Sequence, residues 1–137
     1  MLIALAREDR IYPAVYRLNI KNNRLKKVQA FRKGISDWQA DRNGRVIHGF
    51  GGIRRGKPLA IYLDDGVVTD LDISHLVGER PPEPLGYSAS GKTAYMLANA
   101  GNDTRAVYEV DSKTAKIKSV FPHSKAVSYT HLDAADE

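Results

Sequence analysis

The chain has 137 residues, 42% of them hydrophobic, which is the size and composition of at most one ordinary globular domain. No apolar run approaches the roughly 20 residues of a membrane-spanning helix, and the absence of cysteine excludes disulfides and thiolate metal sites. The formal net charge is +5, although the last twelve residues contain three acids and no base.

The first part of the chain predicts three strands. Leu2–Ala6 is a short apolar run typical of a buried strand, and Pro13 ends the charged loop that follows it. Ala14–Asn19 alternates apolar and polar residues, as a half-buried strand does. Lys21–Asn23 predicts a turn because asparagine tolerates left-handed backbone and hydrogen-bonds its own main chain. Arg24–Gln29 then predicts a second alternating strand that lies on the outside.

The first residues do not have the pattern expected of a secretory signal. Met1 leads directly into the apolar run, without the basic start and longer apolar core of such a signal. We therefore interpret the run as a strand entered midway and Met1 as an internal or accidental start. The compartment stays open between cytoplasmic, periplasmic and secreted.

The middle part of the chain predicts four strands joined by turns. Asn43-Gly44 is among the best short hairpin signals, and Asp64–Gly66 predicts another hairpin turn. A basic, glycine-rich loop is predicted at Gly51–Lys57. The predicted strands are Ile35–Ala40, Arg45–Phe50, Pro58–Leu63 and Val67–Ile73.

A proline-rich connector, Val77–Pro84, precedes four more predicted strands, because proline cannot donate to a strand ladder. No segment shows sustained helical periodicity. The sequence thus predicts eleven strands, grouped as three, four and four, and no helix. The last four strands are Leu85–Ser88, Lys92–Ala98, Arg105–Asp111 and Lys116–Phe121.

An internal repeat connects the three groups. Residues 15–28 align without a gap to residues 107–120, with five identical positions. Tyr16, Tyr62 and Tyr108 are spaced by 46 residues and again by 46, and each ends a short Ala-Val-Tyr or Ala-Ile-Tyr phrase. Four antiparallel strands in a period of about 40–50 residues are typical of β-propeller blades.

The predicted fold is therefore all-β: a partial β-propeller with two complete four-stranded blades and three strands of a preceding blade. The propeller is predicted over residues 1–125, with blades at about residues 1–33, 34–79 and 80–123. Residues 126–137 break the period and resemble translated sequencing-adapter read-through, or else form an ordinary disordered tail. Three blades leave further blades of a longer chain as expected partners.

One octet resembles a phosphate-binding loop. Gly86–Thr93 fits G-x-x-x-x-G-K-[ST], which requires a buried strand before it and a helix after it whose N-terminus faces the phosphates. Here three prolines in four residues precede the octet, and the repeat demands a strand and a hairpin there. We interpret the octet as a hairpin and keep nucleotide binding as a third hypothesis. Gly86-Tyr87-Ser88 matches the start of the G-x-S-x-G pattern of a nucleophile elbow, but the second glycine, Gly91, comes one residue late.

The remaining polar residues predict no site. His48, His75 and His123 are scattered without ligand spacing, and a calcium loop needs more oxygens than Asp64-Asp65 and Asp70-x-Asp72 supply. We predict no catalytic, cofactor-binding or metal-binding residue.

Basic residues occur in three groups, Lys21–Lys27, Arg32-Lys33 and Arg54–Lys57, which could attract nucleic acid. They lack interleaved aromatic residues or a binding motif, so we predict solvated strands and loops and neither a nucleic-acid nor a membrane partner. Trp38, the single tryptophan, is predicted to pack between blades.

The chain resembles the N-terminal propeller of the prolyl oligopeptidase family of serine peptidases, in its bacterial acylaminoacyl-peptidase-like branch. The resemblance spans about residues 1–123, and the strand–turn–strand phrase ending in Ser-Gly-Lys occurs in other propellers as well. The segments that carry it are residues 2–9 with 15–19, 37–44, 84–92, and 99–103 with 107–111.

The resemblance implies a module that does no chemistry. In that family the propeller covers an α/β-hydrolase domain further along the chain and restricts access to short peptides, whereas the hydrolase supplies the Ser, Asp and His. No triad residue carries over to this sequence, so this chain alone is expected to be inactive, with a hydrolase domain and a peptide substrate as the parent's partners. The alternative is a set of blades from a non-catalytic periplasmic or scaffold binding propeller.

Overall fold

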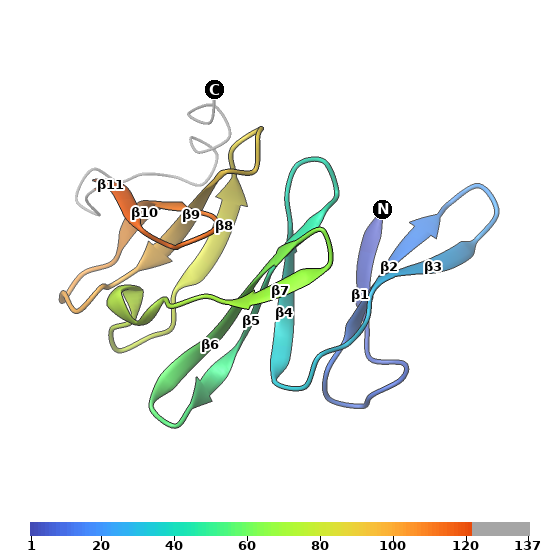
Figure 1. Cartoon of the computed structure of the whole chain (residues 1–137), viewed down its shortest axis with the longest axis horizontal. Coiled ribbons are helices and arrows are strands. Elements are labelled where there is room, and N and C mark those ends of the chain that lie inside the picture. The colour runs from blue at the N-terminus through green and yellow to red at the C-terminus, as the bar shows by residue number, and fades with distance from the viewer. Residues whose placement is uncertain (122–137) are drawn as a thin grey trace.

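The computed structural model describes residues 1–121, which form three antiparallel sheets (Figure 1). The predicted tail at residues 126–137 and His123 lie outside the described residues. The N-terminal sheet has the order β1-β2-β3, the middle sheet β4-β5-β6-β7 and the C-terminal sheet β8-β9-β10-β11. The strands are β1 (Leu2–Leu5), β2 (Ala14–Asn19), β3 (Arg24–Gln29), β4 (Ile35–Ala40), β5 (Val46–Arg54), β6 (Lys57–Asp64), β7 (Val67–Asp70), β8 (Glu83–Tyr87), β9 (Thr93–Ala98), β10 (Ala106–Asp111) and β11 (Ile117–Phe121).

The predicted all-β class and the grouping of strands as three, four and four are confirmed. The only helix within residues 1–121 is a three-residue 3-10 turn, Ser74–Leu76, and no helix there is long and apolar enough to cross a membrane. The turn begins where Asp72 Oδ1 accepts hydrogen bonds from the Ser74 N–H, at 3.0 Å, and the Ser74 hydroxyl, at 2.6 Å. This local bonding competes with the strand ladder, so β7 ends at Asp70 rather than at Ile73.

The predicted loop at Gly51–Lys57 is wrong. β5 continues to Arg54 and β6 begins at Lys57, which leaves only Arg55 and Gly56 as the turn, both with positive φ. The glycines do not break the strand because Gly51 pairs with Ile35, where the missing side chain lets β5 approach the backbone before β4. A Cβ on Gly51 would lie 2.0 Å from the carbonyl oxygen of Gly34.

The even spacing of the three tyrosines is not a structural equivalence. The Leu18 N–H donates to the carbonyl of Met1, beside β1, and the Ser112 N–H donates to the carbonyl of Lys92, beside β9. Along an antiparallel strand, residues that are two or four positions apart bond toward the same neighbouring strand. Tyr16 lies two residues before Leu18 and Tyr108 lies four residues before Ser112, so both tyrosines bond toward the preceding strand of their sheets.

The backbone hydrogen bonds of Tyr62 point in the opposite direction. The carbonyl of Ala60 accepts from the Leu71 N–H beside β7, so Tyr62, two residues along, bonds toward the following strand. The residue equivalent to Tyr16 and Tyr108 is therefore Ile61, and the structural spacings are 45 and 47 residues. Hairpin length differs accordingly: two residues separate β6 from β7, whereas four separate β2 from β3.

The three sheets pack face to face in chain order, as Figure 1 shows. The Ile61 face of the middle sheet meets the N-terminal sheet, where Trp38 Nε1 donates to the carbonyl of Pro13 at 2.8 Å. The packing of Trp38 between sheets is thereby confirmed. Arg17, on the face opposite to Tyr16, lines a cavity together with Leu63 of the middle sheet.

The opposite face of the middle sheet packs on the C-terminal sheet. Their shared core contains most of the buried side chains, and Tyr108 lies on the side that faces the middle sheet. The middle and C-terminal sheets thus turn the same face toward the sheet before them, and the N-terminal sheet turns the opposite face, with Arg17, toward the middle sheet. We call this arrangement head-to-tail stacking. The shared core comprises Ile47, Phe50, Ala60, Leu71, Ile73, Leu76, Tyr87, Ala94, Met96, Ala98, Tyr108, Val110 and Ala115.

Candidate functional site

His48 links the middle and C-terminal sheets at the centre of their shared core. Its side chain is only 2% exposed. Nε2 lies 2.7 Å from the carbonyl oxygen of Ser112 and Nδ1 lies 2.6 Å from the hydroxyl of Tyr87. A carbonyl only accepts, so Nε2 carries the proton, and Nδ1 accepts from Tyr87. The network thereby selects one tautomer of a neutral imidazole.

The surroundings of His48 disfavour its charged form. The rings of Phe50, Tyr62 and Tyr87 lie with their centroids 5.4–5.8 Å from the imidazole. Burial lowers the pKa of His48 below its ordinary value of 6.5 and raises the pKa of Tyr87. Both ring nitrogens are occupied, and Ser112 contributes its carbonyl while its hydroxyl donates to Gly91. His48 therefore holds two sheets together and has no free nitrogen with which to activate a serine.

This network makes stability depend on pH. The pKa of His48 is lower in the folded than in the unfolded protein, so the unfolded chain binds more protons below about pH 6.5. We expect the free energy of unfolding to fall as pH decreases from 6.5 toward the lowered pKa, by at most about 1.4 kcal/mol per pH unit. Urea denaturation at several pH values measures this slope. The titratable groups facing His48 are Tyr62, Tyr87 and Asp111.

The His48→Gln variant is the control, since glutamine does not titrate and the carboxyl groups contribute equally to both proteins. The difference in slope between the two proteins isolates the histidine. Equal slopes between pH 5 and 6.5 would contradict the assignment.

A second feature is an open cavity of about 370 Å³ at the loop between β9 and β10. Asn99 lines this cavity and is 7% exposed, and its Nδ2 donates to the carbonyl of Asn102 at 3.3 Å. Asn99 Oδ1 has no hydrogen-bond partner within residues 1–121. The loop reverses through Ala100 and Gly101, which both have positive φ. The lining residues are Glu79, Arg80, Leu97, Asn99, Asp103, Thr104 and Arg105.

Arg105 forms the other side of the same cavity. One terminal nitrogen donates to the carbonyl of Leu97 at 3.2 Å, and the other lies 3.6 Å from Glu83. Its Nε is buried and, in the described part of the chain, has no acceptor. Native proteins leave few buried polar atoms unpaired. An unpaired donor and an unpaired acceptor beside the same cavity therefore call for an explanation.

The sequence pattern contained no signal for this cavity. Asn99 and Arg105 fall in a predicted loop and at the start of a predicted strand, and they become neighbours only when the hairpin closes. The contact of Gly78 with Asn99 is equally unpredictable, since the connector approaches so closely that a Cβ on Gly78 would lie 2.5 Å from Asn99 Cβ.

The octet at Gly86–Thr93 is a hairpin, as predicted. β8 enters it, β9 leaves it, and no helix follows. Ser88 accepts from the Thr93 N–H at 3.2 Å through its hydroxyl oxygen, which is the bonding of a turn residue. The backbone carbonyl of Lys92 is engaged by the Ser112 N–H. The helix N-terminus that would bind phosphate in a nucleotide site is therefore missing from this position.

The histidines and aspartates lie apart. His75 Nε2 bonds the carbonyl of Ala115 at 2.7 Å, and Asp65 lies in the turn between β6 and β7. Among residues 1–121 no three His, Asp or Glu side chains form a group that could hold a metal ion.

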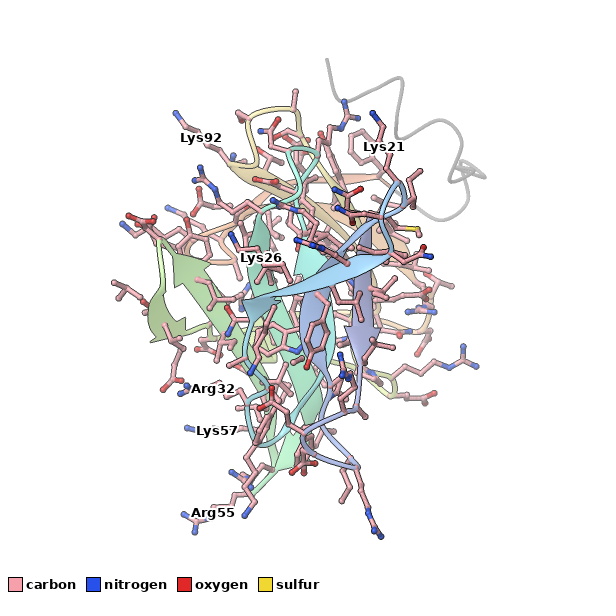
Figure 2. All side chains as sticks on the ribbon, turned by 90° about the vertical axis from the view of Figure 1, so that its right-hand side faces the viewer. Lys21, Lys26, Arg32, Arg55, Lys57 and Lys92 are labelled. Carbon is pink, nitrogen blue, oxygen red and sulfur yellow. The ribbon has the colours of Figure 1, made fainter. Side chains whose placement is uncertain are left out.

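The predicted solvation of the basic groups agrees with their positions. Figure 2 shows Lys21 and Lys92 near one end of the molecule and Arg55 near the opposite end. Lys27 forms an ion pair with Glu8. Within residues 1–121 these charges are spread over several elements and both ends of the fold.

No protein-family model matches this chain, and no curated protein and no solved structure shows significant similarity to it.

Proposed function

We propose that this chain forms three consecutive blades of a β-propeller that performs no catalysis itself and gates peptide access to an α/β-hydrolase domain of a longer serine peptidase. The observation that carries the proposal is the head-to-tail stacking of the three sheets. A propeller requires that each blade turn the same face to the blade before it, because successive blades are related by a rotation about one axis. A stack of sheets packed like face to like face would argue against it.

The peptidase part of the proposal comes from the sequence resemblance to the prolyl oligopeptidase family. The strand–turn–strand phrases around residues 37–44 and 84–92 lie in the hairpins β4–β5 and β8–β9. His48 bonds the backbone of Ser112 and not a serine hydroxyl, so it does not serve as the base of a catalytic serine. The alternative function is a non-catalytic periplasmic or scaffold binding propeller, and the cavity beside Asn99 and Arg105 is compatible with either function.

The first experiment is to sequence the gene that encodes this chain together with the regions on both sides of it. We expect further blades followed by an α/β pattern with G-x-S-x-G and, later, Asp and His. A frame that ends after the last blade would contradict the peptidase and leave the binding propeller. A frame without further four-strand repeats would contradict the propeller itself.

A further inference from the structure

We propose that the cavity between the β9–β10 loop and the connector before β8 is a subsite for one backbone amide of a peptide. The choice of a peptide as the ligand rests on the proposed function. The evidence for it is independent, because it comes from two unpaired polar atoms.

The first atom is the acceptor Asn99 Oδ1. The orientation of this carboxamide is determined by its neighbour, since Nδ2 donates to the carbonyl of Asn102. Exchanging the amide oxygen and nitrogen would place two oxygens against each other. Oδ1 is thus an acceptor, is buried, and lacks a donor within the described residues.

The second atom is the donor Nε–H of Arg105. The terminal nitrogens of this guanidinium are engaged by the Leu97 carbonyl and by Glu83, which hold the side chain in the cavity wall. Within residues 1–121, Nε is left without an acceptor. The two sides of the cavity therefore contain one buried acceptor and one buried donor.

A peptide amide carries the matching pair, an N–H for Asn99 Oδ1 and a C=O for Arg105 Nε–H. The charged side chains that line the cavity balance, since Arg80 and Arg105 stand against Glu79 and Asp103, so the lining has no net positive charge that would select a phosphate over a neutral group. Leu97 adds an apolar surface for a side chain of the peptide.

Both unpaired atoms expose less than 1 Å² to solvent. Contact with a ligand therefore requires a small shift of the loop that spans residues 99–104. This loop contains Ala100 in left-handed backbone, a conformation that is costly for a residue other than glycine. We expect the loop to open when the amide enters and to become more ordered when the two hydrogen bonds form.

The test uses the full chain, ¹⁵N-labelled, titrated with N-acetylalanine N-methylamide while the backbone amide signals are followed by NMR. Two ester analogues are compared, each with one N–H replaced by oxygen. We expect saturable shifts at residues 97–105 with the diamide. We also expect about a fivefold weaker affinity for the ester that lacks the N–H directed at Asn99.

Two variants separate the donor from the charge. Arg105→Lys keeps the cation but removes Nε–H, and we expect it to weaken diamide binding by about fivefold. Glu83→Gln removes the ion pair, leaves Nε–H in place, and should bind the diamide like the wild type. A melting temperature close to that of the wild type shows that each variant is folded.

Equal affinities for the diamide and both esters, or unchanged binding by Arg105→Lys, would overturn the subsite and leave the proposed peptidase untouched. Shifts confined to residues outside 97–105 would overturn it as well. Binding with the expected ester and lysine effects, in a gene frame without a hydrolase, would support the subsite and contradict the peptidase.

Discussion

Replacing His48 by alanine is expected to lower the free energy of unfolding by about 4 kcal/mol, a large share of the stability of a small domain. The substitution leaves a cavity in the core shared by the middle and C-terminal sheets. It also leaves the hydroxyl of Tyr87 and the carbonyl of Ser112 without their partner. Urea denaturation at pH 8, where the imidazole is neutral in both states, measures the loss directly.

His75→Ala is the matched control. The His75 ring also bonds a backbone carbonyl, that of Ala115 at 2.7 Å, but the residue is exposed, so water can replace the bond. We expect a loss of less than about 1 kcal/mol. The Tyr87→Phe variant should cost an intermediate amount and should not be additive with His48→Ala, because both substitutions remove the same hydrogen bond. Similar losses for both histidine variants would contradict the central position of His48.

Gly51→Ala is expected to destabilise the protein by about 3 kcal/mol. The added Cβ would lie 2.0 Å from the carbonyl oxygen of Gly34 and 3.1 Å from Leu59 Cδ2. The first of these contacts is with backbone, so β5 must move away from the chain that leads into β4, and the ladder between the two strands is strained. Thermal or urea denaturation of the purified variant measures the cost.

The adjacent glycine offers the control. Gly52 lies in the same strand, but a Cβ there would have no atom of residues 1–121 within 4 Å. Gly52→Ala should change the free energy of unfolding by no more than about 0.5 kcal/mol, with a tendency to stabilise because alanine restricts the unfolded chain. If both variants lost the same stability, the close approach of β5 to the Gly34 backbone would be wrong.

The strands and most turns were predictable because their causes are local. Alternation of apolar and polar residues marked the strand at Ala14–Asn19, and Asn43-Gly44 marked the hairpin between β4 and β5. Gly51 misled the prediction, because a pair of glycines resembles a loop when the neighbouring backbone is unknown. In the sheet, the same residue is what allows that backbone to come close.

The repeat shows how far sequence similarity extends. The match of Ala60–Tyr62 to the two other phrases placed Tyr62 in register with Tyr16 and Tyr108, whereas the hydrogen bonds make Ile61 the equivalent residue. A three-residue phrase cannot reveal a shift of one residue. Such a shift moves every side chain of a strand to the other face of its sheet.

The sequence by itself determined the all-β class, the eleven strands and their grouping, since backbone preference and turn chemistry depend on neighbours along the chain. Only the tertiary structure decided which face of each sheet is covered and which polar groups meet. His48 meets Tyr87 through the packing of two sheets, and Asn99 and Arg105 come to line one cavity through the closure of a hairpin. Burial and hydrogen bonding depend on what surrounds a side chain in space, and spacing along the chain does not encode those surroundings.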